Sequence, residues 1–217
     1  MKTAIPPQKP ALRCNGLNRF FDQVMALTIR EKRLRTLLLE PIRKHKPRYI
    51  LDVGCGTGTL ALLLHRQFPG ARVFGLDGDE TALVIARQKN AVAGWPVILD
   101  QGLSTALPYP DEGLDIVTCI LLLHRLSDAD KKQSIGEMRR VLTSGGTLML
   151  ADWDKPASEL IGLLFLGLQL FDGFDTQKAN VHGLIPAILY DSGFKQITQT
   201  GHVTTLLGTL AIYRAKL

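Results

Sequence analysis

The stretch Leu51–Gly58, with the sequence LDVGCGTG, decides the fold of this 217-residue chain. It follows the short apolar run Tyr49–Val53 and precedes a segment with helical spacing, so it joins a strand to a helix. Three glycines within positions 54–58 let the backbone turn sharply and come close to a ligand. We therefore expect a ligand-binding turn directly after the first strand.

A second feature lies further along the chain, where the run Val73–Asp77 ends in an acid 19 positions after Gly58. An acid at about this distance from a glycine turn accepts hydrogen bonds from both hydroxyl groups of an adenosine ribose. The two features together fit a dinucleotide or S-adenosylmethionine. They therefore leave open the interpretation of the chain as a nicotinamide-dependent oxidoreductase.

The charge of Asp52, just before the glycine turn, distinguishes the two ligands. Its carboxylate would repel a pyrophosphate but attract a ligand that carries an ammonium group and a sulfonium. A length of 217 residues also suits one domain, whereas a dehydrogenase usually needs a second, substrate-binding domain. Both observations favour S-adenosylmethionine.

Short apolar runs alternate with helical segments, a pattern typical of a parallel sheet covered on both faces. The expected strands are Tyr49–Val53, Arg72–Asp77, Val97–Leu99, Leu114–Ile120 and Thr147–Asp152, and the expected helices between them are Thr59–Gln67, Glu80–Ala93 and Asp128–Leu142. Two last strands, Gln196–Thr200 and Leu206–Arg214, have no helix between them, so they must pair antiparallel. The sequence predicts an α/β, doubly wound, Rossmann-like sheet of seven strands, mostly parallel with a C-terminal antiparallel hairpin and helices on both faces.

These features and several later motifs resemble the class I S-adenosylmethionine-dependent methyltransferases. Leu51–Gly58 is similar to the first motif of that family, and Asp77 is similar to its ribose-binding acid. The later motifs follow in the family's order and are Leu107–Asp111 (LPYPD), Leu114–Val117 (LDIV), Leu123–Leu126 (LHRL) and Val141–Gly146 (VLTSGG). Within the family, the chain most resembles the branch that includes the ubiquinone and menaquinone biosynthesis methyltransferases.

The resemblance implies that the chain binds S-adenosylmethionine and releases S-adenosylhomocysteine. Residues around the glycine turn would surround the methionine part, Asp77 would hold the ribose, and Ile120 would offer its carbonyl oxygen to the amino group of the cofactor. The cofactor-binding residues implied in this way are Asp52, Gly54, Cys55, Gly56, Gly58, Asp77, Gly78, Leu103, Ser104 and Ile120. The chain departs from the family at Leu103, where an Asp often bonds the adenine amino group. Backbone groups, apolar contacts and Ser104 would then hold the adenine.

Methyl transfer from a sulfonium is an in-line displacement, so positioning of the acceptor is the main task of such a site. A general base is needed only if the acceptor must lose a proton. His124, just beyond the fourth strand, is one candidate for that base, and Asp152, at the end of the fifth strand, is another. The alternatives are that His124 forms a wall of the pocket and that Asp152 caps a helix or turn.

We expect one methyltransferase domain over residues 1–217, with a helical cap (1–48), a cofactor-binding core (49–152), a substrate-lid insert (153–194) and the hairpin (195–217). The segment Leu160–Leu168 of the insert is strongly apolar, which suggests a quinol-like, phenol-like or lipid acceptor. The alternative is that this segment only covers the core. Ile120–Leu123 stands where base-amine methyltransferases carry their signature, so nucleic acid is not the expected acceptor. A binding protein that holds S-adenosylmethionine without catalysis also stays open.

The composition sets further limits on the protein. Three widely spaced cysteines, Cys14, Cys55 and Cys119, suit neither a disulfide framework nor a metal cluster, so we expect no metal and a cytoplasmic location. The longest apolar stretch, Ile161–Phe171, is shorter than the ~20 residues that span a bilayer, although peripheral membrane contact stays open. The net charge of +6 arises largely from basic residues before position 50, which suit a solvated helix face. The sequence predicts no oligomeric state.

Overall fold

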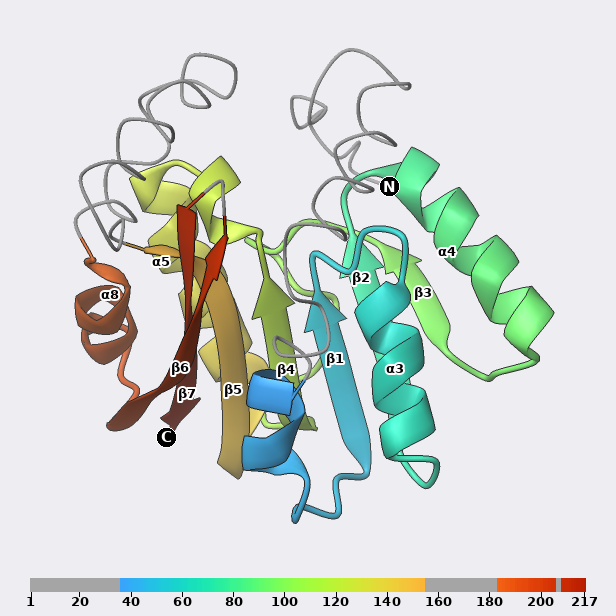
Figure 1. Ribbon diagram of the computed structural model, residues 1–217, viewed down its shortest axis with the longest axis horizontal. Helices are drawn as coiled ribbons and strands as arrows, with labels where there is room; N and C mark the ends of the chain where they lie inside the picture. Colours follow the sequence, from blue (N-terminus) through green and yellow to red (C-terminus); the bar gives the residue numbers. More distant parts are fainter. Residues whose placement is uncertain (1–35, 155–182, 206–207) are drawn as a thin grey trace.

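The computed structural model describes residues 36–154, 183–205 and 208–217 (Figure 1). These residues form one seven-stranded sheet with the strand order β3-β2-β1-β4-β5-β7-β6. The strands are β1 (Tyr49–Val53), β2 (Arg72–Asp77), β3 (Ile98–Gln101), β4 (Leu114–Ile120), β5 (Leu142–Asp154), β6 (Gln196–Thr205) and β7 (Gly208–Lys216). Neighbours among β1 to β5 are parallel, and β7 is antiparallel to both β5 and β6. The predicted sheet of five parallel strands and a final hairpin is confirmed.

Helices cover both faces of the sheet, as the sequence predicts (Figure 1). They are α3 (Thr59–Gln67), α4 (Glu80–Ala93), α5 (Asp128–Val141) and α8 (Ile185–Asp191), with short 3-10 turns η1 (Glu40–Ile42) and η2 (Leu123–Arg125). Alternate side chains of each strand enter different cores because successive side chains point to opposite faces. Ile50 packs with α3, whereas Leu51 and Val53 pack in the core that includes α5 and α8.

Four strands differ from their expected bounds. In the hairpin, β6 ends at Thr205 instead of Thr200, and β7 covers Gly208–Lys216 instead of Leu206–Arg214. β3 covers Ile98–Gln101 instead of Val97–Leu99, because an edge strand with half-exposed side chains tolerates the polar Asp100 and Gln101. β5 begins at Leu142 instead of Thr147, because α5 ends at Val141 and the chain continues directly in extended form. The two glycines before Thr147 do not end the strand, and a register shift against β4 accommodates them.

The apolar segment Leu160–Leu168 and most of the expected cap lie outside the described residues. The division of the chain into cap, core, lid and hairpin therefore stays a prediction. Among the described helices, none is long and apolar enough to cross a membrane.

Candidate cofactor and acceptor site

The glycine turn after β1 has a backbone that only glycine adopts easily. Gly54, Gly56 and Gly58 have φ angles of +73°, +52° and +75°, in the left-handed region where other residues are strained. The amides of Gly54 and Cys55 both donate to the carbonyl oxygen of Leu76, over 2.8 and 3.0 Å. The turn is therefore fixed against the end of β2, which also carries Asp77.

The carboxylate of Asp77 completes this link. Its Oδ2 atom accepts a hydrogen bond of 2.7 Å from the amide of Gly56, and its Oδ1 atom accepts one of 2.8 Å from the amide of Asp79. Each carboxylate oxygen can accept a further hydrogen bond, so two hydroxyl groups of one ligand can be held. Burial raises the pKa of Asp77, although the two backbone amides partly oppose this shift.

The space around the three glycines differs from one position to the next. A Cβ atom on Gly58 would lie 2.9 Å from Ala86 of α4, and one on Gly54 would lie 3.2 Å from the side chain of Leu122. Among the described residues, no atom lies within 4 Å of where a Cβ atom on Gly56 would be. The described part of the chain therefore leaves space beside Gly56, next to the ribose-binding candidate Asp77. The residues present fit an adenosyl ligand at this position.

Asp52 lies beneath the turn and is only 2% exposed. Its Oδ1 atom accepts a 2.7 Å hydrogen bond from the hydroxyl group of Thr118 in β4. Burial raises the pKa of Asp52 to about 7, and the nearby charge of Asp77 adds to the increase. A bound cation would favour the ionised form of this carboxyl group, so its charge and a cationic ligand are coupled.

Other residues implied for the cofactor lie at the same end of the sheet. Gly78 follows β2, and Leu103 and Ser104 follow β3. Ser104 is buried, and its hydroxyl group is 2.8 Å from that of Ser134 in α5. Its side chain is thus directed at α5, and any contact with adenine would come from its backbone.

Cys55 and Cys119 are buried free thiols. Burial is the main cause that raises the pKa of each, and the charge of Asp52 adds to both shifts. The two side chains are therefore neutral, which suits small packing residues rather than nucleophiles.

The two catalytic candidates are brought together. His124 lies in η2 after β4, Asp152 lies in the neighbouring strand β5, and the His124 Nδ1 and Asp152 Oδ1 atoms are 2.9 Å apart. Asp152 also accepts hydrogen bonds from the amides of Leu123, His124 and Trp153. The positions of His124 and Asp152 in the sequence indicate each as a candidate base but do not predict that the two residues pair.

Two features of the site have no signal in the sequence. Leu121, directly after β4, has a φ of +54°, and its amide donates to the carbonyl oxygen of Ala151 over 2.9 Å. A leucine in this region is strained, which is common next to binding sites. The hydrogen bond from Thr118 to Asp52 was also not predicted, because it joins neighbouring strands far apart in the sequence.

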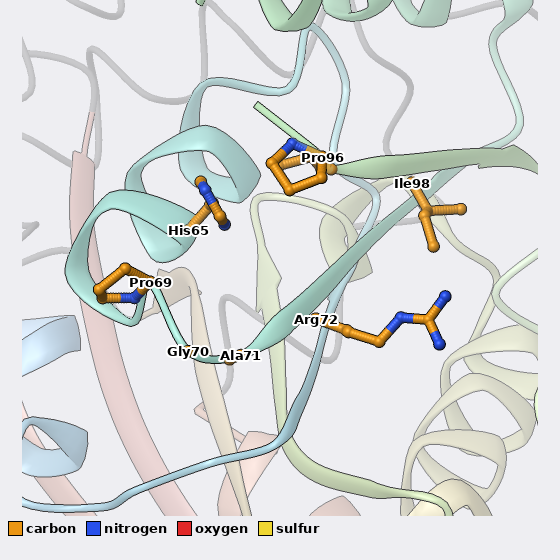
Figure 2. A pocket seen from close by; sticks show the side chains of 8 residues that line it. His65, Pro69, Gly70, Ala71, Arg72, Pro96 and Ile98 are labelled. Atoms are coloured by element: carbon orange, nitrogen blue, oxygen red, sulfur yellow. The ribbon is translucent and has the colours of Figure 1, made fainter. Parts of the chain in front are cut away.

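A pocket of about 550 Å³ lies elsewhere, at the start of β2 and β3 (Figure 2). Its lining residues include His65, Pro69, Arg72, Pro96 and Ile98. Parallel strands present ligands at their carboxyl ends. This pocket lies at the opposite, amino-terminal ends, so it is separate from the glycine turn.

Comparisons with known proteins agree with this geometry. A family described as "Methyltransferase domain" matches residues 50–146. The demethylmenaquinone methyltransferase of Deinococcus radiodurans is 40% identical over 121 residues, which cover 56% of this chain and 49% of that protein. The demethylmenaquinone methyltransferase of Thermus thermophilus is 38% identical over 119 residues, which cover 55% of this chain and 53% of that protein. The chain thus spans about half the length of these curated relatives.

A solved structure supports the fold over a longer range. The SAM dependent methyltransferase from Aquifex aeolicus has a TM-score of 0.65 and 19% sequence identity, and the match covers 93% of this chain and 97% of that chain. The family match and the relatives, which include a ubiquinone/menaquinone biosynthesis C-methyltransferase of Geobacter sulfurreducens, support the same assignment. Residues 50–146 therefore carry a methyltransferase domain, and the relatives that match it include enzymes of ubiquinone and menaquinone biosynthesis.

Proposed function

We propose that this chain transfers the methyl group of S-adenosylmethionine to a small apolar acceptor, with a quinol or phenol ring favoured over a lipid. The observation that carries the proposal is the glycine turn fixed to Asp77, with space beside Gly56 that none of the described residues fills. This arrangement suits an adenosyl ligand. The names of the curated relatives favour a quinone-like ring as the acceptor.

Each residue of the turn has a distinct task in this proposal. When bound, S-adenosylmethionine supplies a methyl group made electrophilic by the sulfonium. Asp77 would hold the ribose hydroxyl groups, and the buried Asp52 would favour the positive charges of the cofactor. Fixed in this way, the methyl group can be aligned with an acceptor held above the carboxyl ends of β4 and β5. Alignment can contribute about 7–11 kcal/mol to the lowering of the barrier.

The acceptor would enter at the carboxyl ends of the strands. In this proposal the cap (1–48) and the lid insert (153–194) cover the site with those of their residues that lie outside the described ranges, because their described parts, η1 and α8, pack in the two cores of the sheet. The apolar sequence of Leu160–Leu168 supports an apolar acceptor. The same character is consistent with peripheral contact with a membrane that holds such a molecule.

Ligand binding and turnover distinguish the proposed methyltransferase from two other functions. A nicotinamide-dependent oxidoreductase would bind NAD, which the buried Asp52 disfavours because of its charge. A binding protein without catalysis would hold S-adenosylmethionine but transfer no methyl group.

The test is calorimetric titration of the chain with S-adenosylmethionine, S-adenosylhomocysteine and NAD, followed by transfer of labelled methyl to a prenylated 1,4-naphthoquinol. We expect micromolar binding of both adenosyl ligands, no response to NAD, and labelled product. Binding of NAD alone would overturn the proposal. Binding of S-adenosylmethionine without transfer to any quinol, phenol or lipid amine would instead indicate a binding protein.

A further inference from the structure

The side chains of His124 and Asp152 form one hydrogen-bonded unit, with 2.9 Å between Nδ1 and Oδ1. His124 is 5% exposed and Asp152 is fully buried. We propose that Asp152 orients His124 so that its Nε2 atom accepts a proton from a hydroxyl group on an aromatic acceptor. This inference rests on the proposed function and narrows its acceptor to a hydroxylated ring.

The hydrogen bond determines which ring nitrogen is basic. An ionised carboxylate can only accept, so Nδ1 carries the hydrogen that it donates to Asp152, and Nε2 keeps its lone pair. Within the described residues, no hydrogen bond reaches Nε2 of His124. The neutral ring is therefore prepared to accept a proton at the nitrogen that points away from Asp152.

The unit lies beside the candidate cofactor site. β4 and β1 are neighbours in the sheet, with Cys119 opposite Val53. Leu122, two residues before His124, has its Cβ atom only 3.2 Å from where a Cβ atom of Gly54 would lie. The loop that carries His124 thus touches the glycine turn, and an acceptor over β4 would lie between the two.

Among the described residues, an indole, a thiol and a guanidinium lie near the pair of His124 and Asp152. Trp153 packs its ring edge-on to His124, with centroids 6.5 Å apart. The thiol of Cys119 has its pKa raised well above the usual value by burial and by the charges of Asp152 and Asp52, so it stays neutral. Arg125 follows in η2 as an exposed cation, and its charge acts on Asp77. Asp152 is therefore the one charged group shown to contact the ring among the described residues.

Transfer of the hydroxyl proton to His124 makes the acceptor nucleophilic toward the methyl carbon. The O–H bond of the ring hydroxyl breaks, its proton moves to Nε2, and the electron pair spreads over the oxygen and the ring. That pair forms the new bond to the methyl carbon, while the bond between sulfur and methyl breaks and leaves its pair on a neutral thioether. If carbon is methylated, that carbon then loses its proton to water and the oxygen regains one from the imidazolium. One proton is released in total per methyl group transferred.

A purely structural role makes a different prediction. Asp152 also holds the amides of Leu123 and Trp153, at 2.7 and 2.8 Å, so it would fix this loop in any case. Under that reading, His124 is only a wall of the pocket. Its replacement would then change acceptor binding without changing how turnover depends on pH.

The test compares the wild type with His124→Gln, Asp152→Asn and, as a matched control beside the ring, Trp153→Phe. Each full-length chain is assayed with S-adenosylmethionine and a prenylated 1,4-naphthoquinol, kept reduced by dithionite, from pH 6 to pH 10. We expect unchanged S-adenosylmethionine binding in calorimetry for all variants. For His124→Gln we expect kcat to fall by about 10²–10⁴-fold at pH 7, the usual contribution of a general base.

The pH profile and chemical rescue separate catalysis from structure. In His124→Gln, kcat should rise about tenfold per pH unit, because the acceptor must ionise without help. Added imidazole should restore turnover to His124→Gly, and Asp152→Asn should show a reduced kcat with a shifted profile. Should Asp152→Asn fail to fold, the His124 variants still decide the question.

Two outcomes overturn the inference and can be told apart. If the wild type transfers methyl and His124→Gln has the same kcat across the pH range, His124 and Asp152 do not act as a base. The proposed function is then left intact. The wild type could instead bind S-adenosylmethionine and methylate an aliphatic amine, but neither the naphthoquinol nor a phenol. That result would overturn both the role of His124 as a base and the assignment of a hydroxylated ring as the acceptor. The naphthoquinol dimethyl ether, which has no proton to lose, should not be methylated.

Discussion

A Cβ atom on Gly58 would lie 2.9 Å from the Cβ atom of Ala86, so the glycine turn and α4 meet at the backbone of Gly58. Gly58 is also the residue before α3, with a φ of +75°. One glycine therefore sets both the start of α3 and its distance from α4. Gly56, two residues earlier, also has a positive φ, but no atom of residues 36–154, 183–205 and 208–217 lies within 4 Å of where its Cβ atom would be.

This contrast predicts different effects for the same substitution at two glycines. Gly58→Ala should lower the free energy of unfolding by about 1–2 kcal/mol from backbone strain and about 1–3 kcal/mol from overpacking against Ala86. Gly56→Ala should show only the strain of about 1–2 kcal/mol, but should weaken S-adenosylmethionine binding. Chemical denaturation and calorimetric titration measure the two effects.

A second substitution tests the contact itself. Ala86→Gly in the Gly58→Ala background should restore the free energy of unfolding that is lost to overpacking. The gain is reduced by about 0.5–1 kcal/mol, because a glycine inside a helix is destabilising. If the double variant is no more stable than Gly58→Ala, the contact with α4 does not explain why Gly58→Ala is destabilised.

The sheet could be predicted because its information is local. Each central strand is a short apolar run, and the hairpin of β6 and β7 follows from their short connection. The edge strand β3 and the start of β5 were misplaced, since Asp100, Gly145 and Gly146 do not suit a strand by composition. Pairing with a neighbour determines those bounds, and pairing is not local in the sequence.

The candidate site was predictable only as a list of residues. The glycine spacing indicated the turn, and its distance to Asp77 indicated the ribose position. The pairing of His124 with Asp152 could not be predicted, because it depends on β4 lying beside β5. The direction of Ser104 toward Ser134 likewise depends on how α5 packs.

Asp77→Ala should abolish most cofactor affinity. Hydrogen bonds to a charged group contribute about 1.5–3 kcal/mol each, so the loss of two should raise the Kd for S-adenosylmethionine at least about a hundredfold. Calorimetric titration measures this change, with circular dichroism to check the fold. Asp79→Asn is the matched control, because Asp79 caps α4 through the amide of Thr81 and asparagine caps equally well. Unchanged affinity in Asp77→Ala would remove the ribose assignment.

Arg140 of α5 should be important for stability. Its guanidinium donates to the carbonyl oxygens of Leu107 and Tyr109, each over 2.9 Å, and pairs with Glu137, whose Oε atom accepts from the amide of Leu107. Lysine cannot reach both carbonyl groups, so Arg140→Lys should lower the free energy of unfolding by about 1–3 kcal/mol. Chemical denaturation measures it. The control is Arg66→Lys, on the exposed end of α3, which should leave the free energy of unfolding unchanged. If Arg140→Lys and Arg66→Lys change the free energy of unfolding equally, the hydrogen bonds of Arg140 to the two carbonyl groups do not contribute to stability.

Asp52→Asn should change the pH dependence of both folding and binding. Burial raises the pKa of Asp52 to about 7 in the folded chain, so the folded state holds a proton that the unfolded state releases above pH 4. The wild type should therefore lose stability as pH rises from 4 to 7, by up to about 4 kcal/mol from this group. The asparagine introduced by Asp52→Asn cannot ionise, and its amide can still bond Thr118. The variant should therefore match the wild type near pH 4 and exceed it at pH 8.

Cofactor binding should show the opposite dependence on pH. A cationic ligand favours the ionised carboxylate, so S-adenosylmethionine should bind the wild type more tightly at pH 8 than at pH 6, and Asp52→Asn should show no such gain. Thermal unfolding and calorimetric titration at both pH values measure the two effects. Equal pH profiles for the two proteins would mean that Asp52 titrates in the folded chain as it does in the unfolded one, and would leave its charge without a role in binding.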